Sequence, residues 1–170
     1  RDLVRSRGLG DVYKRQVWGI PDPAAGRIEG NIGRSLKDRL QMAVFPADSE
    51  LGKHAVTHYE IVETFAHVSL VKCVLETGRT HQIRVHMKHI GHPLFNDARY
   101  GGDQVLRGTT AASYRQFVRN CFDTCPRQAL HARTLGFVHP RTGREMFFEA
   151  PVPADMTALI EKWRAYAESH

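Results

Sequence analysis

The alternation of side-chain character is clearest in two neighbouring stretches, residues 55–63 and 68–76. Both are rich in β-branched residues, and their side chains fall into two alternating sets, as on the two faces of a β-strand. Only four residues, Thr64-Phe65-Ala66-His67, separate the stretches, so the pattern predicts an antiparallel pair. The second strand then leads through Thr77-Gly78 into the next element.

That next element is predicted to be a short helix between Thr80, a fair N-cap, and Gly91 with Pro93, a fair stop. At helical spacing one face is apolar and another is cationic or titratable: Ile83, Met87 and Ile90 against His81, Arg84 and Lys88. Arginine is always charged and offers a rigid fork of donors, so Arg84 suits a phosphate or a carboxylate. A solvated basic face explains the spacing equally well.

The remaining elements are shorter. The pattern predicts a strand that ends at 17–20, a strand at 27–32, helices at 111–122 and from Asp155 onward, and a hairpin of 135–138 with 145–149. We therefore predict an α+β fold with a mixed, mostly antiparallel sheet flanked by a few helices.

Composition narrows the class of protein. The 170 residues are enough for one domain, and the net charge of +6 excludes ten histidines, so a polyanion such as nucleic acid is the favoured partner. Three cysteines give no paired disulfide framework. No signal peptide or membrane-length apolar run is evident, so we expect a cytoplasmic protein with no membrane partner. We also expect a monomer.

Residues 1–16 differ from the rest of the chain. They are strongly basic and have no clear amphipathic period, and they read like a translated adapter at the end of a reading frame. We expect this segment to be non-native and the domain to occupy 17–170. The alternative is a basic arm that binds RNA.

Three stretches together carry a resemblance: Arg79-Thr80-His81-Gln82-Ile83-Arg84-Val85-His86, then Gly91-His92-Pro93, then Asp97-Ala98-Arg99-Tyr100-Gly101. This run, long and without gaps, resembles the RluA-type (RluA/RluD-like) pseudouridine synthases. The likeness continues in weaker form from about Val17 to the C-terminus. It implies the C-terminal portion of the catalytic domain, truncated at its N-terminus.

What the resemblance implies is isomerisation of specific uridines to pseudouridine in structured RNA, with large-subunit ribosomal RNA as the expected substrate. It implies no cofactor and no metal. The family places its catalytic aspartate in a His-Arg-Leu-Asp motif, which is not found in this sequence. We therefore expect the 170-residue chain itself to be inactive.

The resemblance also implies roles for single residues. Arg84 matches the arginine that pairs with the catalytic aspartate, Leu130 matches an apolar residue under the substrate pocket, and Tyr13 falls in register with the tyrosine that stacks on the base. Residues that would contact RNA are Arg79, His81 and Lys88 in the central stretch and Arg34 and Arg39 in a basic loop.

Asp97 follows the central stretch in a turn, and we interpret it as an aspartate that bonds its own backbone rather than as the catalytic one. Two other readings remain open. One is a non-catalytic RNA-binding protein that uses the basic helix, and the other is a metal-dependent hydrolase built on His81, His86, His89 and His92.

Overall fold

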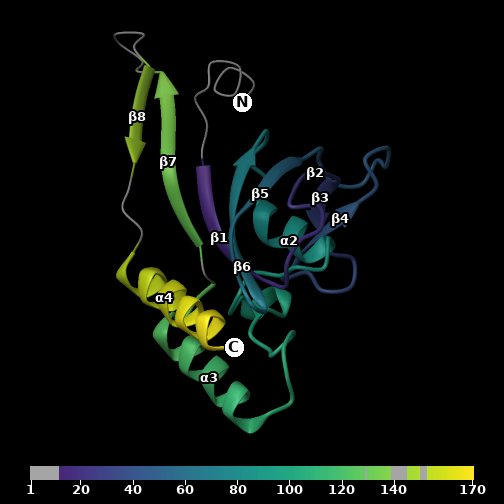
Figure 1. The fold of residues 1–170 in the computed structure, drawn as a ribbon. Coiled ribbons are helices and arrows are strands. Elements are labelled where there is room, and N and C mark those ends of the chain that lie inside the picture. The colour runs from purple at the N-terminus through teal and green to yellow at the C-terminus, as the bar shows by residue number, and fades with distance from the viewer. Residues whose placement is uncertain (1–11, 129, 139–144, 150–152) are drawn as a thin grey trace.

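The computed structural model describes residues 12–128, 130–138, 145–149 and 153–170; for 130–138 and 145–149 it describes the backbone. Figure 1 shows a long twisted sheet with helices packed on it. The sheet has the strand order β2-β5-β6-β1-β7-β8, and a two-stranded sheet joins β3 to β4. Their bounds are β1 Val12–Trp18, β2 Ala25–Glu29, β3 Asn31–Arg34, β4 Met42–Phe45, β5 Val56–Phe65, β6 Val68–Leu75, β7 Leu130–Val138 and β8 Glu145–Glu149. The predicted α+β class is confirmed.

The predicted pair of strands is β5 and β6, joined antiparallel from Thr57↔Leu75 to Phe65↔Val68. The register shifts between Ile61 and Glu63, which is a bulge that adds twist to the ribbon. The chain then leaves β6 and enters α2, Gln82–His89. Figure 1 shows α2 lying beside the sheet at β5 and β6.

Strand β1 lies inside the sheet, antiparallel to β6 on one side and to β7 on the other. It includes residues 12–16, so a domain boundary at residue 17 does not coincide with a boundary of the fold. The polar pattern of residues 12–16 predicts no strand, and tertiary pairing overrides that local signal. Residues 1–11 lie outside the described part.

The two faces of the sheet hold separate cores because neighbouring strand residues point in opposite directions. Trp18 and Leu70 pack with α3, Ala112–Thr124, and α4, Ala154–Ser169. Val17 and Val71, each one position along, pack instead with Ile83, Met87 and Ile90 of α2. The apolar face predicted for the central helix is confirmed.

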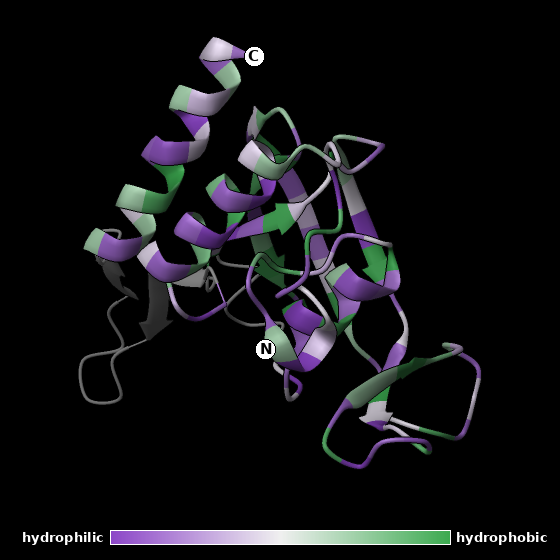
Figure 2. Ribbon diagram, turned by 90° about the horizontal axis from the view of Figure 1, so that it is seen from below, coloured by the Kyte–Doolittle hydropathy of each residue, from purple (hydrophilic) through white to green (hydrophobic). Residues whose placement is uncertain are grey.

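The strand predicted at 27–32 is in fact two strands. It breaks at Gly30, after which the chain enters the β3–β4 hairpin, whose strands pair from Asn31↔Phe45 to Arg34↔Met42. A Cβ at Gly30 would lie 2.5 Å from Val44, so the chain passes too closely there for a larger residue. Figure 2 shows this small sheet set apart from the main body, on the side away from α3 and α4.

Candidate functional site

The first turn of α2 is held by side chains beneath it. Thr80 is not the N-cap: that position belongs to His81, in the left-handed region at φ 54°, with no side-chain cap. The Gln82 side chain holds the turn that precedes the helix, because its Oε1 accepts from the Arg79 backbone N–H at 3.0 Å and from the Thr77 hydroxyl at 2.7 Å.

The same network continues through a buried histidine. Gln82 Nε2 donates to the Thr57 hydroxyl at 3.0 Å, and that hydroxyl lies 2.7 Å from His86 Nδ1. His86 Nε2 lies 3.2 Å from the Gly30 carbonyl oxygen. Each polar atom thus has a partner when the imidazole is neutral with its proton on Nε2, and burial lowers the pKa of His86. Gln82 and His86 are structural parts of the central stretch.

Because this imidazole is buried, we expect the free energy of unfolding to decrease as the pH is lowered. Above about pH 6.5 His86 is neutral in both the folded and the unfolded chain. Below that value the unfolded chain gains a proton that folded His86 resists, so the free energy of unfolding decreases, by at most about 1.4 kcal/mol per pH unit for one proton. Urea melts between pH 7.5 and 5 should show a smaller decrease for His86→Gln than for wild type. The exposed control His170→Gln should behave as wild type; an equal slope in all three proteins would contradict the prediction.

Arg84 lies on the opposite side of α2 and is bound in a fork. Its Nε and Nη2 each donate to one carboxylate oxygen of Asp97 at 2.8 Å. The Asp97 side chain is fully buried and that of Arg84 is 15% exposed. This hydrogen bonding raises the pKa of Arg84, so the guanidinium is charged throughout the accessible pH range. The expectation that Asp97 bonds its own backbone is wrong: its carboxylate is the counter-ion of Arg84.

Tyr100, nearly fully buried, joins the cationic side chains of the helix to the turn that carries Asp97. Arg84 and Lys88 lie over its ring, 5.0 and 5.8 Å from the centroid. Its hydroxyl accepts from the Met42 backbone N–H at 2.9 Å and lies 2.8 Å from His81 Nδ1. Burial, and then the charge of Arg84, lowers the pKa of His81, which favours a neutral imidazole here. The structure thus brings together the predicted residues Arg84, Lys88 and His81.

Arg79 is farther along the same edge. Its Nε donates to the His54 carbonyl at 2.9 Å, and its exposed side chain lines a cleft of about 480 Å³ between the β3–β4 hairpin and the turn before α2. Lys53 lines the same cleft. Arg34 and Arg39 lie on the hairpin, where Arg34 Nη1 donates to the Arg39 carbonyl at 2.9 Å. These three arginines and Lys88 are all solvent-accessible.

Strand β1 brings Tyr13 to this region. Tyr13 is half-buried among the residues under α2, and the guanidinium of Arg15 lies 4.9 Å from the centre of its ring. Arg15 is 6% exposed, and burial lowers its pKa to about 10. Arg84 and Asp97 lie close enough to interact electrostatically with its guanidinium. Leu130 pairs with Arg15 across β1 and β7. Its side chain lies outside the described part of the chain.

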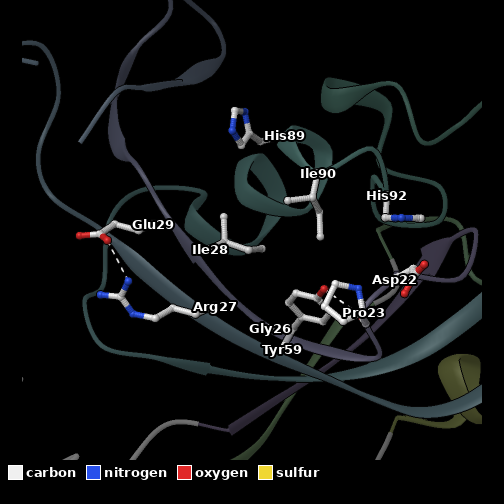
Figure 3. A pocket seen from close by; sticks show the side chains of 10 residues that line it. All are labelled: Asp22, Pro23, Gly26, Arg27, Ile28, Glu29, Tyr59, His89, Ile90 and His92. Carbon is white, nitrogen blue, oxygen red and sulfur yellow. Dashed lines mark hydrogen bonds and ion pairs between the residues drawn. The ribbon is translucent and has the colours of Figure 1, made fainter. Parts of the chain in front are cut away.

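A different pocket, of about 400 Å³, lies at the C-terminal end of α2 (Figure 3). None of the residues predicted to bind RNA or uracil lines it, whereas two histidines of the metal-site alternative, His89 and His92, do. Figure 3 shows two of its polar contacts: Arg27 with Glu29 at 2.8 Å, and the Tyr59 hydroxyl with the Pro23 carbonyl at 2.8 Å. We therefore place the candidate site at Arg84 and Tyr100.

Two further features bear on the class of protein. Among the described residues, no group of three or more His, Cys, Asp or Glu side chains is arranged to hold a metal ion. Within the same ranges, no helix combines the length and the apolar character needed to span a bilayer.

Comparison with known proteins assigns the family. The model of the family "RNA pseudouridylate synthase" matches residues 2–89. An uncharacterized RNA pseudouridine synthase of Chlorobaculum parvum is 46% identical over 94% of this chain and 48% of its own length. Ribosomal large subunit pseudouridine synthase D of Escherichia coli is 46% identical over 86% of this chain and 43% of its own.

The chain therefore spans about half the length of the curated relatives that it matches. A solved structure, human RNA Pseudouridylate Synthase Domain Containing 1, has the same fold, with a TM-score of 0.64 at 24% identity over 96% of this chain and 69% of that one. The resemblance seen in the central stretch is confirmed over a longer part of the sequence. The chain belongs to the RNA pseudouridylate synthase family.

Proposed function

We propose that the complete protein isomerises specific uridines to pseudouridine in structured RNA, with large-subunit ribosomal RNA as the substrate. The relative from Escherichia coli, whose name specifies the ribosomal large subunit, supports this substrate class. The observation that carries the proposal is the buried fork of Arg84 on Asp97, beside Tyr100 and at the edge of a cationic surface.

The reaction needs a carboxylate at the sugar and a cation to keep that carboxylate ionised and oriented. The C1′–N1 bond breaks, the uracil turns, and a C1′–C5 bond forms; C5 loses its proton and N1 gains one, so the atoms balance. Asp97 accepts hydrogen bonds from Nε and Nη2 of Arg84 and thereby fixes the orientation of the guanidinium. Nη1 is then the nitrogen that can donate to a second carboxylate. We assign that carboxylate to a His-Arg-Leu-Asp segment of the complete protein, which makes Arg84 the positioning cation.

In this proposal Tyr13 stacks on the uracil and Leu130 lies beneath it, on adjacent strands of the sheet. Arg79, His81, Lys88, Arg34 and Arg39 contact the RNA. Phosphate contacts of this kind supply most of the affinity of nucleic-acid-binding proteins and make it depend on salt. The protein acts as a cytoplasmic monomer.

We further propose that residues 1–16 are not the natural sequence, in which case the stacking role belongs to the residue that occupies the place of Tyr13 in the natural β1. The fit of two residues in β1 supports this: Gln16 is fully buried with neither amide atom hydrogen-bonded, and Arg15 Nε has no partner within the described part of the chain. Such unpaired buried groups are costly. Reading the source DNA across Gln16–Val17 tests the proposal; a His-Arg-Leu-Asp codon run upstream of Val17 supports it, and a start codon directly before these sixteen residues overturns it.

The test of function is tritium release from RNA that contains [5-³H]uridine. The complete gene product should release tritium, the 170-residue chain should not, and Arg84→Lys in the complete protein should slow release by roughly 10²–10³-fold. Lysine keeps the charge but cannot form the fork. Salt-dependent RNA affinity without tritium release by the complete protein would favour the non-catalytic RNA-binding alternative. A chelator should have no effect, whereas the metal-dependent hydrolase predicts loss of activity.

A further inference from the structure

Leu36 and Leu40 are the two most exposed large apolar side chains among the described residues. They are 70% and 68% exposed, and Leu51, at 49%, is the next. Both lie in residues 35–41, which connect β3 to β4; this connection is called here the leucine loop. A pair of exposed leucines on a projecting loop lowers solubility and does not pack into the core. Contact with a partner molecule would explain why they are there.

The leucine loop is built by its own hydrogen bonds. The Ser35 hydroxyl oxygen accepts from the backbone N–H groups of Lys37 and Asp38, each at 3.2 Å. Asp38 Oδ1 accepts from the Leu40 N–H at 3.0 Å, and the backbone N–H of Ser35 donates to the Gln41 carbonyl at 2.9 Å. The loop therefore presents its two leucines in a defined geometry and loses little conformational entropy when it binds.

The loop is also tied to the candidate site. Arg99 Nη1 donates to the Leu40 carbonyl at 2.6 Å, and the Gln41 side-chain amide donates to the Arg99 carbonyl. Arg99 belongs to the short η1 helix, Ala98–Tyr100, which directly follows Asp97. The position of the leucine loop is thus set by the same turn that holds Arg84.

The charge around the leucines favours a polyanion as their partner. Three cations, Arg34, Lys37 and Arg39, accompany one carboxylate, Asp38, in this loop and its base. The cleft with Lys53 and Arg79 opens next to the hairpin. An apolar pair surrounded by cations matches RNA, which offers phosphates outside and apolar base faces inside. Proteins that open base stacks insert leucine and similar side chains between adjacent bases.

We propose that Leu36 and Leu40 form a wedge that enters the base stack of the RNA beside the target uridine and holds it open. This inference rests on the proposed function and adds a device that lowers the cost of extruding the uridine, which is a few kcal/mol for a stacked base. The cations of the hairpin bind the flanking phosphates, and the leucines replace the lost stacking contacts.

The experiment uses the complete protein and a short RNA hairpin with 2-aminopurine next to a loop uridine. Unstacking of 2-aminopurine raises its fluorescence. At saturating RNA the wild type should produce this rise, and the double variant Leu36→Ser/Leu40→Ser should lose most of it while its Kd weakens by no more than about tenfold. Lys37→Gln should keep the rise at saturation, weaken binding, and reduce the slope of log K against log salt by about 1.

Leu106→Ser is the matched control, because Leu106 is also an exposed loop leucine, at 41%, and lies outside the hairpin; it should behave as wild type. An undiminished fluorescence rise in the double variant overturns the wedge and leaves the proposed function standing. No RNA binding by the wild type overturns both. A concentration-dependent dimer in sedimentation that the double variant abolishes, with RNA unstacking unchanged, assigns the leucines to a protein contact and overturns the wedge.

Discussion

Asp97→Asn is expected to lower the free energy of unfolding by about 3 kcal/mol, because it leaves the guanidinium of Arg84 without its counter-ion in a nearly closed position. Asparagine matches the aspartate in size, so no cavity forms and the loss reports on charge and hydrogen bonding. One of the two acceptors of the fork also becomes a donor that faces Arg84. Urea melts at neutral pH give the measurement.

The chain supplies a matched control for this prediction. Arg164 forms the same kind of fork on Glu63, at 2.9 and 2.7 Å, but both side chains are exposed, at 46% and 38%. Glu63→Gln should therefore cost less than about 1 kcal/mol. The double variant Arg84→Met/Asp97→Asn should regain part of the loss of Asp97→Asn, because the unpaired charge is gone. Equal costs for Asp97→Asn and Glu63→Gln would show that burial does not strengthen the Arg84 pair.

Gly102→Ala is expected to be as damaging, at about 3 kcal/mol or more, through a backbone collision. A Cβ at Gly102 would lie 1.8 Å from the Leu94 carbonyl oxygen. The neighbouring groups cannot easily move away, since the Gly102 N–H donates to the Asp97 carbonyl at 2.7 Å and the Gly102 carbonyl accepts from Trp18 Nε1 at 2.9 Å. The substitution must distort the turn that aims Asp97 at Arg84.

Two other glycines serve as controls that distinguish this collision from the general effect of replacing a glycine by alanine. Gly78 has open space and no positive φ, so Gly78→Ala should change the free energy of unfolding by less than about 1 kcal/mol. Gly101 also has open space but sits at φ +83°, so Gly101→Ala should cost about 1–2 kcal/mol in backbone strain. Thermal or urea unfolding of the three variants checks the order. A Gly102→Ala protein as stable as Gly78→Ala would contradict the turn geometry described above.

The part of the fold that could be predicted is the part with strong periodicity. The alternation in β5 and β6 and the short connection between them were enough for an antiparallel pair, and the spacing of Ile83 and Met87 was enough for the buried face of α2. Gln82 and His86 were not predicted as buried because periodicity treats them as polar. Their burial depends on partners such as Thr57 and Gly30, which are distant in sequence.

The candidate site was predicted only in its cationic half. The fork of Arg84 on Asp97 depends on a turn closed by Gly102, and no local pattern reports such a pairing. One signal was nevertheless present in the sequence. The apolar face of α2 brings the guanidinium of Arg84 close to the core, where a charged group needs a counter-ion. Asp97 is the first acidic residue after Glu76 and was therefore the nearest downstream candidate. The internal position of β1 could not be predicted, because residues 12–16 carry no strand-like alternation and are placed by pairing with β6 and β7.

The position of β1 has a consequence for how the protein folds as it is synthesised. Val12 pairs with Val74 in β6 and with Thr134 in β7, so β1 joins two strands that both follow it in the sequence, and β7 is the more distant of the two. On the ribosome, one edge of β1 has no partner until β7 has emerged from the exit tunnel. Pairings between residues so far apart in sequence form slowly, and an open strand edge favours aggregation meanwhile. The order of synthesis therefore makes the β1–β7 pairing form after the β2–β5, β5–β6 and β1–β6 pairings.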